Sequence, residues 1–539
     1  MKLLRLFVVL VLALTLTLSD AQASCGPRIR RNWDAMSNAE KATYKGALAA
    51  AMDSGAYIKF VEIHTEMMSE MEAHKQCINK ALTGECKTLG DCSPILKELG
   101  GFSSSSRKTV VINGKNVTGI CVAEAPLNHF CQSSSATGAT CAGCLPRGKW
   151  GSAQIPASLS YASVIGQVFN GANIEKVSRT VERGCHTDIH ATLGSTMAKY
   201  QSPADPIFWS HHAMLDALLT IFHKCRVGTR RMTFEEKATD PVAWASCKRR
   251  VGKQATGEPF KPTDIVTMRT GEKGSNPIEG SKDPLIGQYF EGIPNRFADL
   301  MDGSDLGIGS YTYEINGLLA TMYNSCGGLS IKSHNTRAPP AISPSTFVPE
   351  SPTVTPTTTA PETSNDRSQG EQIHGVHSVF DWLFSQTMPK RSTPRRRLSG
   401  CRTATKKTTE KIMLPSRSHR DTTPVVIAAS LTRSEKRVMN WYHETMTSNG
   451  GYSVKNIADM ERQVCMFQDQ CLGGIMDYTE EFKSLWGVQE SRCRTITNDI
   501  HRGEQEIIDS AWKEKMKAHF GCPHPINETI VSDGIKQSL

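Results

Sequence analysis

The stretch from His186 to His212 reads HTDIHATLGSTMAKYQSPADPIFWSHH. His186 and His190 are four residues apart, so on a helix their rings project from one face and can share one metal ion. Asp205 is a good N-cap and Pro206 a good first residue for a second helix that carries the closing histidine pair. The stretch therefore predicts two packed helices that together offer three imidazoles to one ion.

The residues alone do not choose between the two paired histidines. Adjacent helical residues point about 100° apart, so only one of His211 and His212 is expected to reach the ion. The helix IFWSHHAMLDALLTIFHKC is apolar on most sides, and its periodicity does not separate them. Two histidines four residues apart are by themselves more often a surface or capping feature, so the metal site depends on the whole stretch.

The whole stretch resembles the second copper motif of the tyrosinases and related type 3 copper proteins, which is H-x3-H followed by SP-x-DPIF-x-x-HH-x3-D. The matching residues are His186, His190, Ser202, Pro203, Asp205, Pro206, Ile207, Phe208, His211, His212 and Asp216. In the family the second histidine of the pair is the ligand, which implies His212. The resemblance also implies that Phe208 packs on the ligand rings, that Asp205 supports the turn, and that Asp216 lies close behind the ligands.

The resemblance covers residues 25 to about 328 and implies a mainly α-helical core with small β-hairpins and long loops. The motif GSYTYE, with Tyr311 and Tyr313, resembles the tyrosine motif that closes such cores, and RIRRNW near residue 30 is expected to meet it. Local patterns agree with this fold class. Ser37 and Glu40 form a capping-box pattern before a helix, and residues 56–76 read as a second helix. RKTVVINGKNVTGICV predicts a hairpin with its turn at Asn113-Gly114.

The family's oxygen chemistry requires a second trio of histidines, because two metal ions about 4 Å apart can hold dioxygen between them. By resemblance its first two members match His64, in YIKFVEIH, and His74, in MEAHKQC. The third is expected soon afterwards in a segment resembling PWHR. That segment is absent, since the chain contains no histidine between His74 and His129.

Three interpretations of this gap are open. We favour the loss of a segment after Cys77, through a skipped exon in the gene model or a real deletion, because both flanks keep the family pattern. In the second interpretation His129, in APLNHFC, substitutes as the sixth ligand, although an ordinary loop histidine is the simpler reading. In the third, the protein keeps one copper site and has abandoned oxygen activation.

The position after His186 bears on the type of reaction. In many of these enzymes an Asn stands there and, with a nearby Glu, orients a water thought to deprotonate a phenol. Here the position is Thr187, and Glu182 is the candidate acid. The resemblance therefore implies oxidation of o-diphenols to quinones more directly than hydroxylation of monophenols.

Residues 1–23 read as a signal peptide. They have a basic start, an apolar run from Leu6 to Leu18 and a cleavage pattern at Ala21-Gln22-Ala23. The apolar run is shorter than the roughly 20 residues that a membrane-spanning helix needs, and no later segment fills that role. In a secreted chain, 17 cysteines predict several disulfides, and sequons at Asn116 and Asn527 predict glycosylation.

The net charge of +9 is concentrated in one region. Residues 331–430 hold 14 Lys and Arg against 7 Asp and Glu, so no folded basic groove for nucleic acid is predicted. That region is also rich in Pro, Thr and Ser, which predicts a disordered linker. The predicted organisation is thus a signal peptide at 1–23, a copper-binding domain at 24–330, the linker at 331–430, and a helical, cysteine-containing domain at 431–539.

These features predict a secreted copper-dependent oxidoreductase resembling tyrosinase and catechol oxidase, with a phenolic substrate and dioxygen as partners. Two copper ions are implied. One is held by His186, His190 and His212, and the other by an incomplete set that includes His64 and His74. As in some relatives, the C-terminal domain is hypothesised to cover the active site until the linker is cut. The alternative is a catalytically inactive secreted protein that binds copper or a partner.

Overall fold

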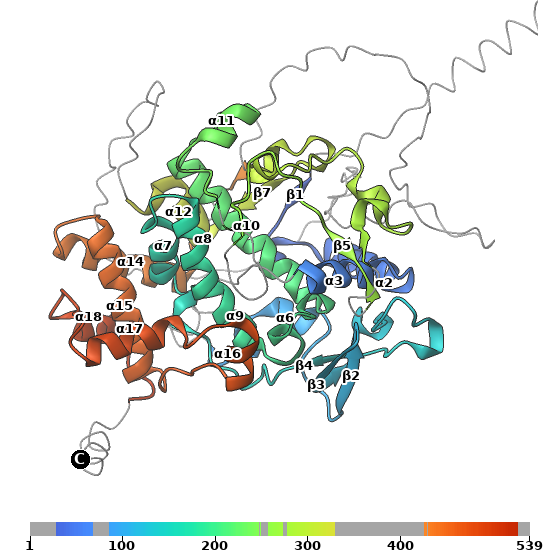
Figure 1. Ribbon diagram of the computed structural model, residues 1–539. Coiled ribbons are helices and arrows are strands. Elements are labelled where there is room, and N and C mark those ends of the chain that lie inside the picture. The colour runs from blue at the N-terminus through green and yellow to red at the C-terminus, as the bar shows by residue number, and fades with distance from the viewer. Residues whose placement is uncertain are drawn as a thin grey trace, which may run out of the picture.

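The computed structural model describes residues 28–67, 86–246, 248, 257–272, 277–328, 425–427 and 430–525. These residues are mainly α-helical, as predicted, and their strands form small separate sheets (Figure 1). The predicted signal peptide, His74, nearly all of the predicted linker and the sequon at Asn527 lie outside the described residues.

The helices and strands have the following bounds. Before residue 330 the α-helices are α2 (Asn38–Asp53), α3 (Ala56–Met67), α5 (Leu89–Cys92), α6 (Pro94–Glu98), α7 (Tyr161–Phe169), α8 (Ile174–Val181), α9 (Thr187–Leu193), α10 (Pro206–Arg226), α11 (Phe234–Thr239) and α12 (Gly317–Ser325). Beyond residue 430 they are α14 (Arg433–Ser448), α15 (Val454–Cys471), α16 (Glu480–Trp486), α17 (Arg492–His501) and α18 (Trp512–Phe520). The strands are β1 (Ile29–Arg30), β2 (Arg107–Ile112), β3 (Lys115–Val122), β4 (Leu145–Arg147), β5 (Arg269–Thr270), β6 (Ile278–Glu279), β7 (Thr312–Ile315) and β8 (Val425–Val426).

Local capping signals determine where α2 and α10 begin. The Ser37 side chain accepts a hydrogen bond from the N–H of Glu40, whose carboxylate in turn accepts from the N–H of Ser37. The Asp205 carboxylate accepts from the N–H of Ile207 at 3.0 Å, and Pro206 is the first residue of α10. Both predicted helix starts are confirmed.

Two small sheets flank the helices. β2 and β3 form the predicted hairpin, with β4 on the other side of β3, and its turn residues Asn113 and Gly114 have φ of 42° and 76°. In the second sheet β7 lies between β1 and β8 and is parallel to both. Its register pairs Arg30 with Tyr313, so the start of the core meets its end as expected.

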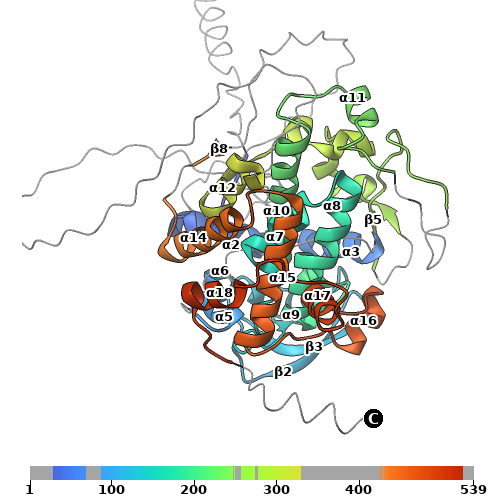
Figure 2. The same ribbon diagram turned by 90° about the vertical axis from the view of Figure 1, so that its left-hand side faces the viewer.

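The helices after residue 430 pack directly on the earlier part of the chain. α15 lies along α7 (Figure 2), and the two share one hydrophobic core with α10 and α14. Val164 and Val168 of α7, and Val464 and Phe467 of α15, are completely buried in it. The division into separate domains stays a prediction, but within the described residues the C-terminal helices are part of the same packed body.

The helical pattern of the predicted C-terminal domain includes residues 503–522, GEQEIIDSAWKEKMKAHFGC, but the first half of this segment is not helical, because α18 begins only at Trp512. Gly503 has a φ of 75°, and the N–H of Glu504 donates to the carbonyl of Asp499, which closes α17. The Asp509 carboxylate accepts from the N–H of Ala511 and supports a new helix start instead.

Six disulfides join described cysteines, as a disulfide-rich chain predicts. They are Cys86–Cys92, Cys121–Cys144, Cys131–Cys141, Cys225–Cys326, Cys465–Cys493 and Cys471–Cys522. The bond between Cys225 and Cys326 fastens α10 to the end of α12. In the part of the chain that the structure describes, no helix combines the length and apolarity that a bilayer crossing requires.

Candidate metal centre

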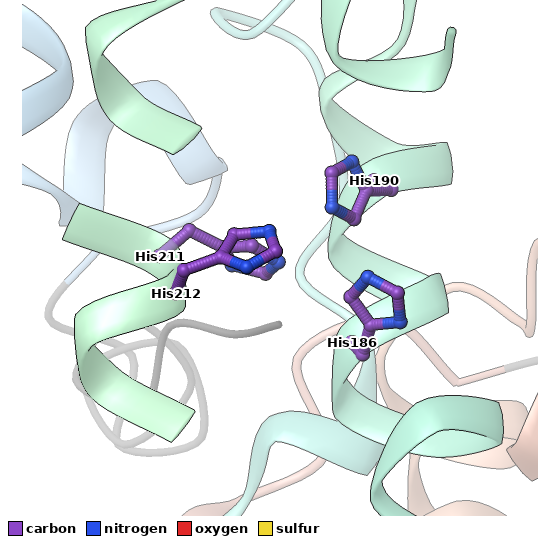
Figure 3. Close-up of side chains that lie close together, drawn as sticks. All are labelled: His186, His190, His211 and His212. Atoms are coloured by element: carbon purple, nitrogen blue, oxygen red, sulfur yellow. The ribbon is translucent and has the colours of Figure 1, made fainter. Parts of the chain in front are cut away.

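The histidines of the stretch 186–212 converge on one point. His186 ends a π-helical turn (Glu182–His186) and His190 lies on α9, whereas His211 and His212 lie on α10 and face them (Figure 3). One ligand atom from each of these four side chains lies within 4.8 Å of the others. Among the described residues, no other group of three or more His, Cys, Asp or Glu side chains is arranged in this way.

Both histidines of the pair belong to this cluster. The ring centroid of His211 is 4.8 Å from that of His190, and the ring centroid of His212 is 5.9 Å from it. From His186 the two are nearly equidistant, at 5.9 and 6.0 Å. The geometry does not single out His212, whose choice over His211 stays a prediction from the family resemblance.

The loop between α9 and α10 orients two of the imidazoles. Nδ1 of His190 lies 2.5 Å from the carbonyl oxygen of Met197, and Nδ1 of His64 lies 2.9 Å from that of Tyr200. An imidazole whose Nδ1–H donates to a carbonyl presents its Nε2 lone pair to a metal. One loop therefore orients a predicted ligand of each half-site.

Phe208 lies between the two predicted half-sites. Its ring centroid is 3.7 Å from that of His212 and 5.0 Å from that of His64, so it packs on the rings of two predicted ligands, as the resemblance implies. His64 lies on α3 and does not belong to the four-histidine cluster. Of the two residues predicted for the first half-site, His64 is the one that the structure places.

The electrostatics favour neutral imidazoles. Burial lowers the pKa of His64, and burial together with the neighbouring His190 lowers the pKa of His186 well below its usual value. Neutral imidazole is the form that binds a transition metal. The cluster contains no carboxylate, and an all-imidazole donor set suits copper or zinc rather than magnesium or calcium. The residues present thus fit one copper ion.

A buried ion pair supports the turn before α10, and the sequence alone did not reveal it. Nε and Nη2 of Arg147 donate to the two carboxylate oxygens of Asp205 at 2.8 and 2.6 Å, and both side chains are fully buried. Arg147 is the last residue of the short strand β4, and its partner lies 58 residues away. The predicted supporting role of Asp205 thus has a physical basis, since the carboxylate serves both the ion pair and the helix cap.

A second polar cluster holds the middle of α10. Arg30 donates to Asp216 at 2.9 Å and to the Tyr313 hydroxyl at 2.7 Å, and its guanidinium lies 3.5 Å from the Tyr311 ring centroid. Both tyrosine hydroxyls donate to the Asp216 carboxylate. The structure therefore brings together the N-terminal basic motif, the tyrosine motif and Asp216.

The structure also places His129, the alternative sixth ligand, and Thr187, which stands where the family often has Asn. His129 is hydrogen-bonded through Nδ1 to the Asp53 carboxylate at 2.8 Å, is partly exposed, and is not in the cluster. The hydroxyl of Thr187 donates to the backbone carbonyl of Glu182. The Thr187 hydroxyl is thus engaged within its own helix.

Side chains of the C-terminal region lie at the centre, and sequence reasoning, which proposed this region as a cover, did not identify them. The ring centroid of Trp486, the last residue of α16, is 5.9 Å from that of His190. The Tyr478 hydroxyl donates to the buried carboxylate of Asp188, and burial raises the pKa of Asp188 to about 6. No pattern around either aromatic residue indicates this role, because their partners lie almost 300 positions earlier.

Comparison with protein families identifies part of the chain. Residues 105–224 match the family model described as the common central domain of tyrosinase. The match contains all four clustered histidines together with Asp205 and Phe208, whereas His64 precedes it. No curated protein and no solved structure matches the chain.

Proposed function

Because residues 105–224 carry the common central domain of tyrosinase, we propose that this protein is a secreted copper oxidoreductase that oxidises o-diphenols to quinones with dioxygen. Monophenols are a second substrate class. The observation that carries the proposal is the cluster of the buried His186, His190 and His211 with the partly buried His212. His186, His190 and His212 would hold one copper ion, and His64 with His74 would contribute to holding a second.

When bound, copper supplies the transfer of electrons from the phenol to dioxygen. The residues of this chain orient the histidine rings and pack around them. The carbonyls of Met197 and Tyr200 fix the rings of His190 and His64, and Phe208 packs against His64 and His212. Trp486 lies beside His190, where it limits contact with water.

The second candidate function is a catalytically inactive secreted protein that binds copper or a partner. It is favoured by one specific observation, the absence of any histidine between His74 and His129. With that gap the first half-site has two histidines from the expected trio. A protein with one loaded site would bind copper without oxidising catechol.

Metal analysis and oxygen uptake on the purified protein separate the two functions. Two copper ions per chain with oxygen-dependent catechol oxidation support the oxidoreductase, and one ion without turnover supports the binder. The variant His190→Asn is expected to lose the copper of the second half-site. His129→Asn is the matched control, because His129 lies outside the cluster. A chain without copper contradicts the oxidoreductase and leaves only the partner-binding form of the second function.

Secretion and glycosylation form part of the proposal. Support comes from six disulfides among the described residues, since such bonds persist in oxidising compartments. Asn116 is exposed on β3, where a glycan can be attached. Expression in a eukaryotic secretory system followed by glycosidase treatment tests this point. A medium without the protein, or a mass unchanged by the glycosidase, contradicts it.

A further inference from the structure

We propose that Gln167 is a positioning residue for His186, and that an ion pair of the C-terminal helices, between Glu461 and Arg492, holds Gln167 in place. The inference rests on the proposed function, because Gln167 binds the backbone of Cys185, and the next residue, His186, is a proposed copper ligand. Under this inference the C-terminal helices help to orient a proposed copper ligand, in addition to the covering role that the sequence suggests.

The backbone before His186 departs from an α-helix. Residues Glu182–His186 form a π-helical turn, and Gly184 within it has φ −116° and ψ −117°, outside the helical range. Such a turn releases backbone groups from the regular hydrogen-bond ladder, and π-helical turns often occur at functional sites. The direction of the His186 side chain therefore depends on what fixes this turn.

Gln167 of α7 fixes the turn from outside. Its Oε1 accepts a hydrogen bond from the backbone N–H of Cys185 at 2.9 Å, and its Nε2 donates to the carbonyl of Ser158 at 2.8 Å. The two contacts need opposite ends of the amide, so they set its orientation. Gln167 is fully buried, and no water competes for these bonds.

Gly184 permits this close approach. A Cβ at position 184 would lie 2.3 Å from Oε1 of Gln167, which is closer than real Cβ atoms come to other atoms. The same Cβ would lie 3.1 Å from Cδ of Arg492. Gln167 and Arg492 therefore both pack closely against the π turn at position 184.

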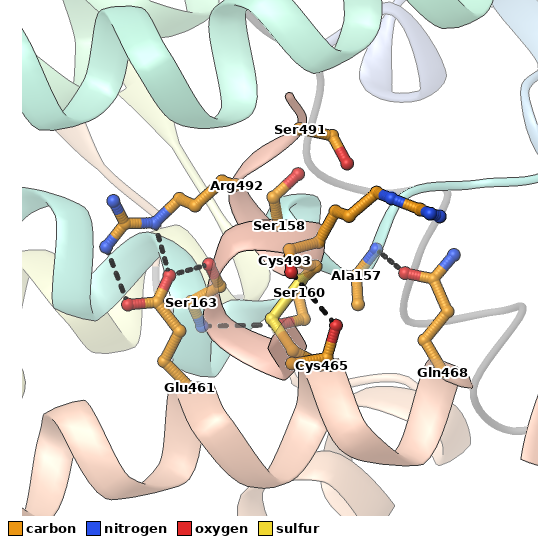
Figure 4. The surroundings of a disulfide bond; sticks show 12 residues. Ala157, Ser158, Ser160, Ser163, Glu461, Cys465, Gln468, Ser491, Arg492 and Cys493 are labelled. Carbon is orange, nitrogen blue, oxygen red and sulfur yellow. Dashed lines mark hydrogen bonds and ion pairs between the residues drawn. A yellow bond between two sulfur atoms is a disulfide. The ribbon is translucent and has the colours of Figure 1, made fainter. Parts of the chain in front are cut away.

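The C-terminal helices hold Gln167 through Ser163. Nε2 of Gln167 donates to the Ser163 hydroxyl at 2.9 Å. This hydroxyl donates to the Glu461 carboxylate, as Figure 4 shows. Arg492 binds both carboxylate oxygens of Glu461, at 2.6 and 2.7 Å. A hydrogen-bonded path therefore runs from α17 through α15 and α7 to the residue before His186.

The charges of this path are balanced, and its carboxylate is buried. The side chain of Glu461 is 5% exposed and that of Arg492 is 21% exposed. Burial alone would lower the pKa of Arg492, but the Glu461 carboxylate, together with Asp188 and Cys185, raises it above the usual value. Removal of Arg492 would leave a carboxylate buried without its partner, and Ser163 and Gln167 would then rearrange around it.

The test compares two buried glutamines of the same interface. Gln468 of α15 accepts from the N–H of Ala157 at 2.7 Å through Oε1 and donates to the carbonyl of Ile155 through Nε2. It therefore makes the same kinds of bond as Gln167, without touching the π turn. Gln167→Met and Gln468→Met keep the volume and each leave one backbone N–H without its acceptor, so both lose similar stability.

The measurement is copper(II) affinity by competition with a chelator, together with the EPR spectrum of the protein loaded with one equivalent of copper. We expect Gln167→Met to weaken copper binding about 10-fold or more and to change the copper hyperfine splitting. Gln468→Met should keep the wild-type values of both. Equal copper affinities and spectra in the two variants would overturn the inference.

A second pair of variants tests the C-terminal end of the path. Arg492→Met breaks the ion pair with Glu461, whereas Arg462→Met breaks a contact between Arg462 and Asp459 that lies within α15. Weaker copper binding in Arg492→Met alone supports the path. Equal copper affinity in both contradicts it. Wild-type protein that binds no copper contradicts the proposed function itself, whereas copper-binding wild type with equal variants contradicts only this inference.

Discussion

The indole ring of Trp486 lies beside the imidazole of His190, with 5.9 Å between the ring centroids. Its Nε1 donates to the carbonyl of Ala198 at 2.9 Å, and its ring packs edge-on against that of Tyr200. Ala198 and Tyr200 belong to the loop that orients His190 and His64. Helix α16 is thus fastened to the same loop that shapes the metal centre.

Trp486→Ala is expected to open the centre. The loss of the indole removes the nearest C-terminal side chain from His190, so bulky o-diphenols should gain about 10-fold in kcat/KM, whereas catechol itself should change less. Steady-state oxygen uptake with the two substrates measures the difference. Leu485→Ala, one position earlier, is the control and should leave both values near wild type. Equal effects of the two variants would argue against Trp486 as a barrier.

Cutting the chain within residues 331–430 should leave the C-terminal helices bound. Val464 and Phe467 of α15 share a core with Val164 and Val168 of α7, and this burial does not depend on the connection between the parts. Size-exclusion chromatography after limited proteolysis should show both fragments in one peak. Separation of the fragments under native conditions would contradict this. Exposure of the site would then require displacement of the helices as well as the cut.

Arg147→Met should destabilise the protein by about 3 kcal/mol or more, because it leaves the Asp205 carboxylate buried without its charge partner. Arg230→Met is the matched control. Arg230 also binds a carboxylate with two nitrogens, that of Glu236, but the pair is exposed and its loss should cost far less stability. Urea unfolding of the three proteins gives the comparison. Equal losses would show that burial does not set the cost.

Asp477 should contribute a pH-dependent part of the stability. Burial alone would raise its pKa, but hydrogen bonds from Lys483 and from the N–H groups of Tyr478 and Ser491 outweigh it and hold the pKa below the usual 3.8. A lowered carboxyl pKa stabilises the fold above the unfolded value, and this part is lost as pH falls through the folded pKa. The free energy of unfolding of wild type should therefore fall more steeply below pH 3.8 than that of Asp477→Asn. Parallel curves would contradict the assignment.

Features that depend on neighbouring residues could be predicted from the sequence. Ser37 with Glu40, Asp205 with Pro206, and Asn113 with Gly114 set two helix starts and one turn through local hydrogen bonds and backbone preferences, and the structure has all three. The spacing of His186 and His190 likewise placed two imidazoles on one face. The motif around them was sufficient to indicate the family.

The distant groups that meet at the centre could be found in the folded structure alone. No local sequence pattern predicts three of these contacts. They join Arg147 to Asp205, Gln167 to the π turn, and Trp486 to His190. Their roles arise from buried contacts between parts of the chain that lie 18 to about 300 residues apart, and such contacts depend on packing rather than on local preference. The same packing brought His211 into the cluster beside His212, where helical geometry alone predicts that one of them points away.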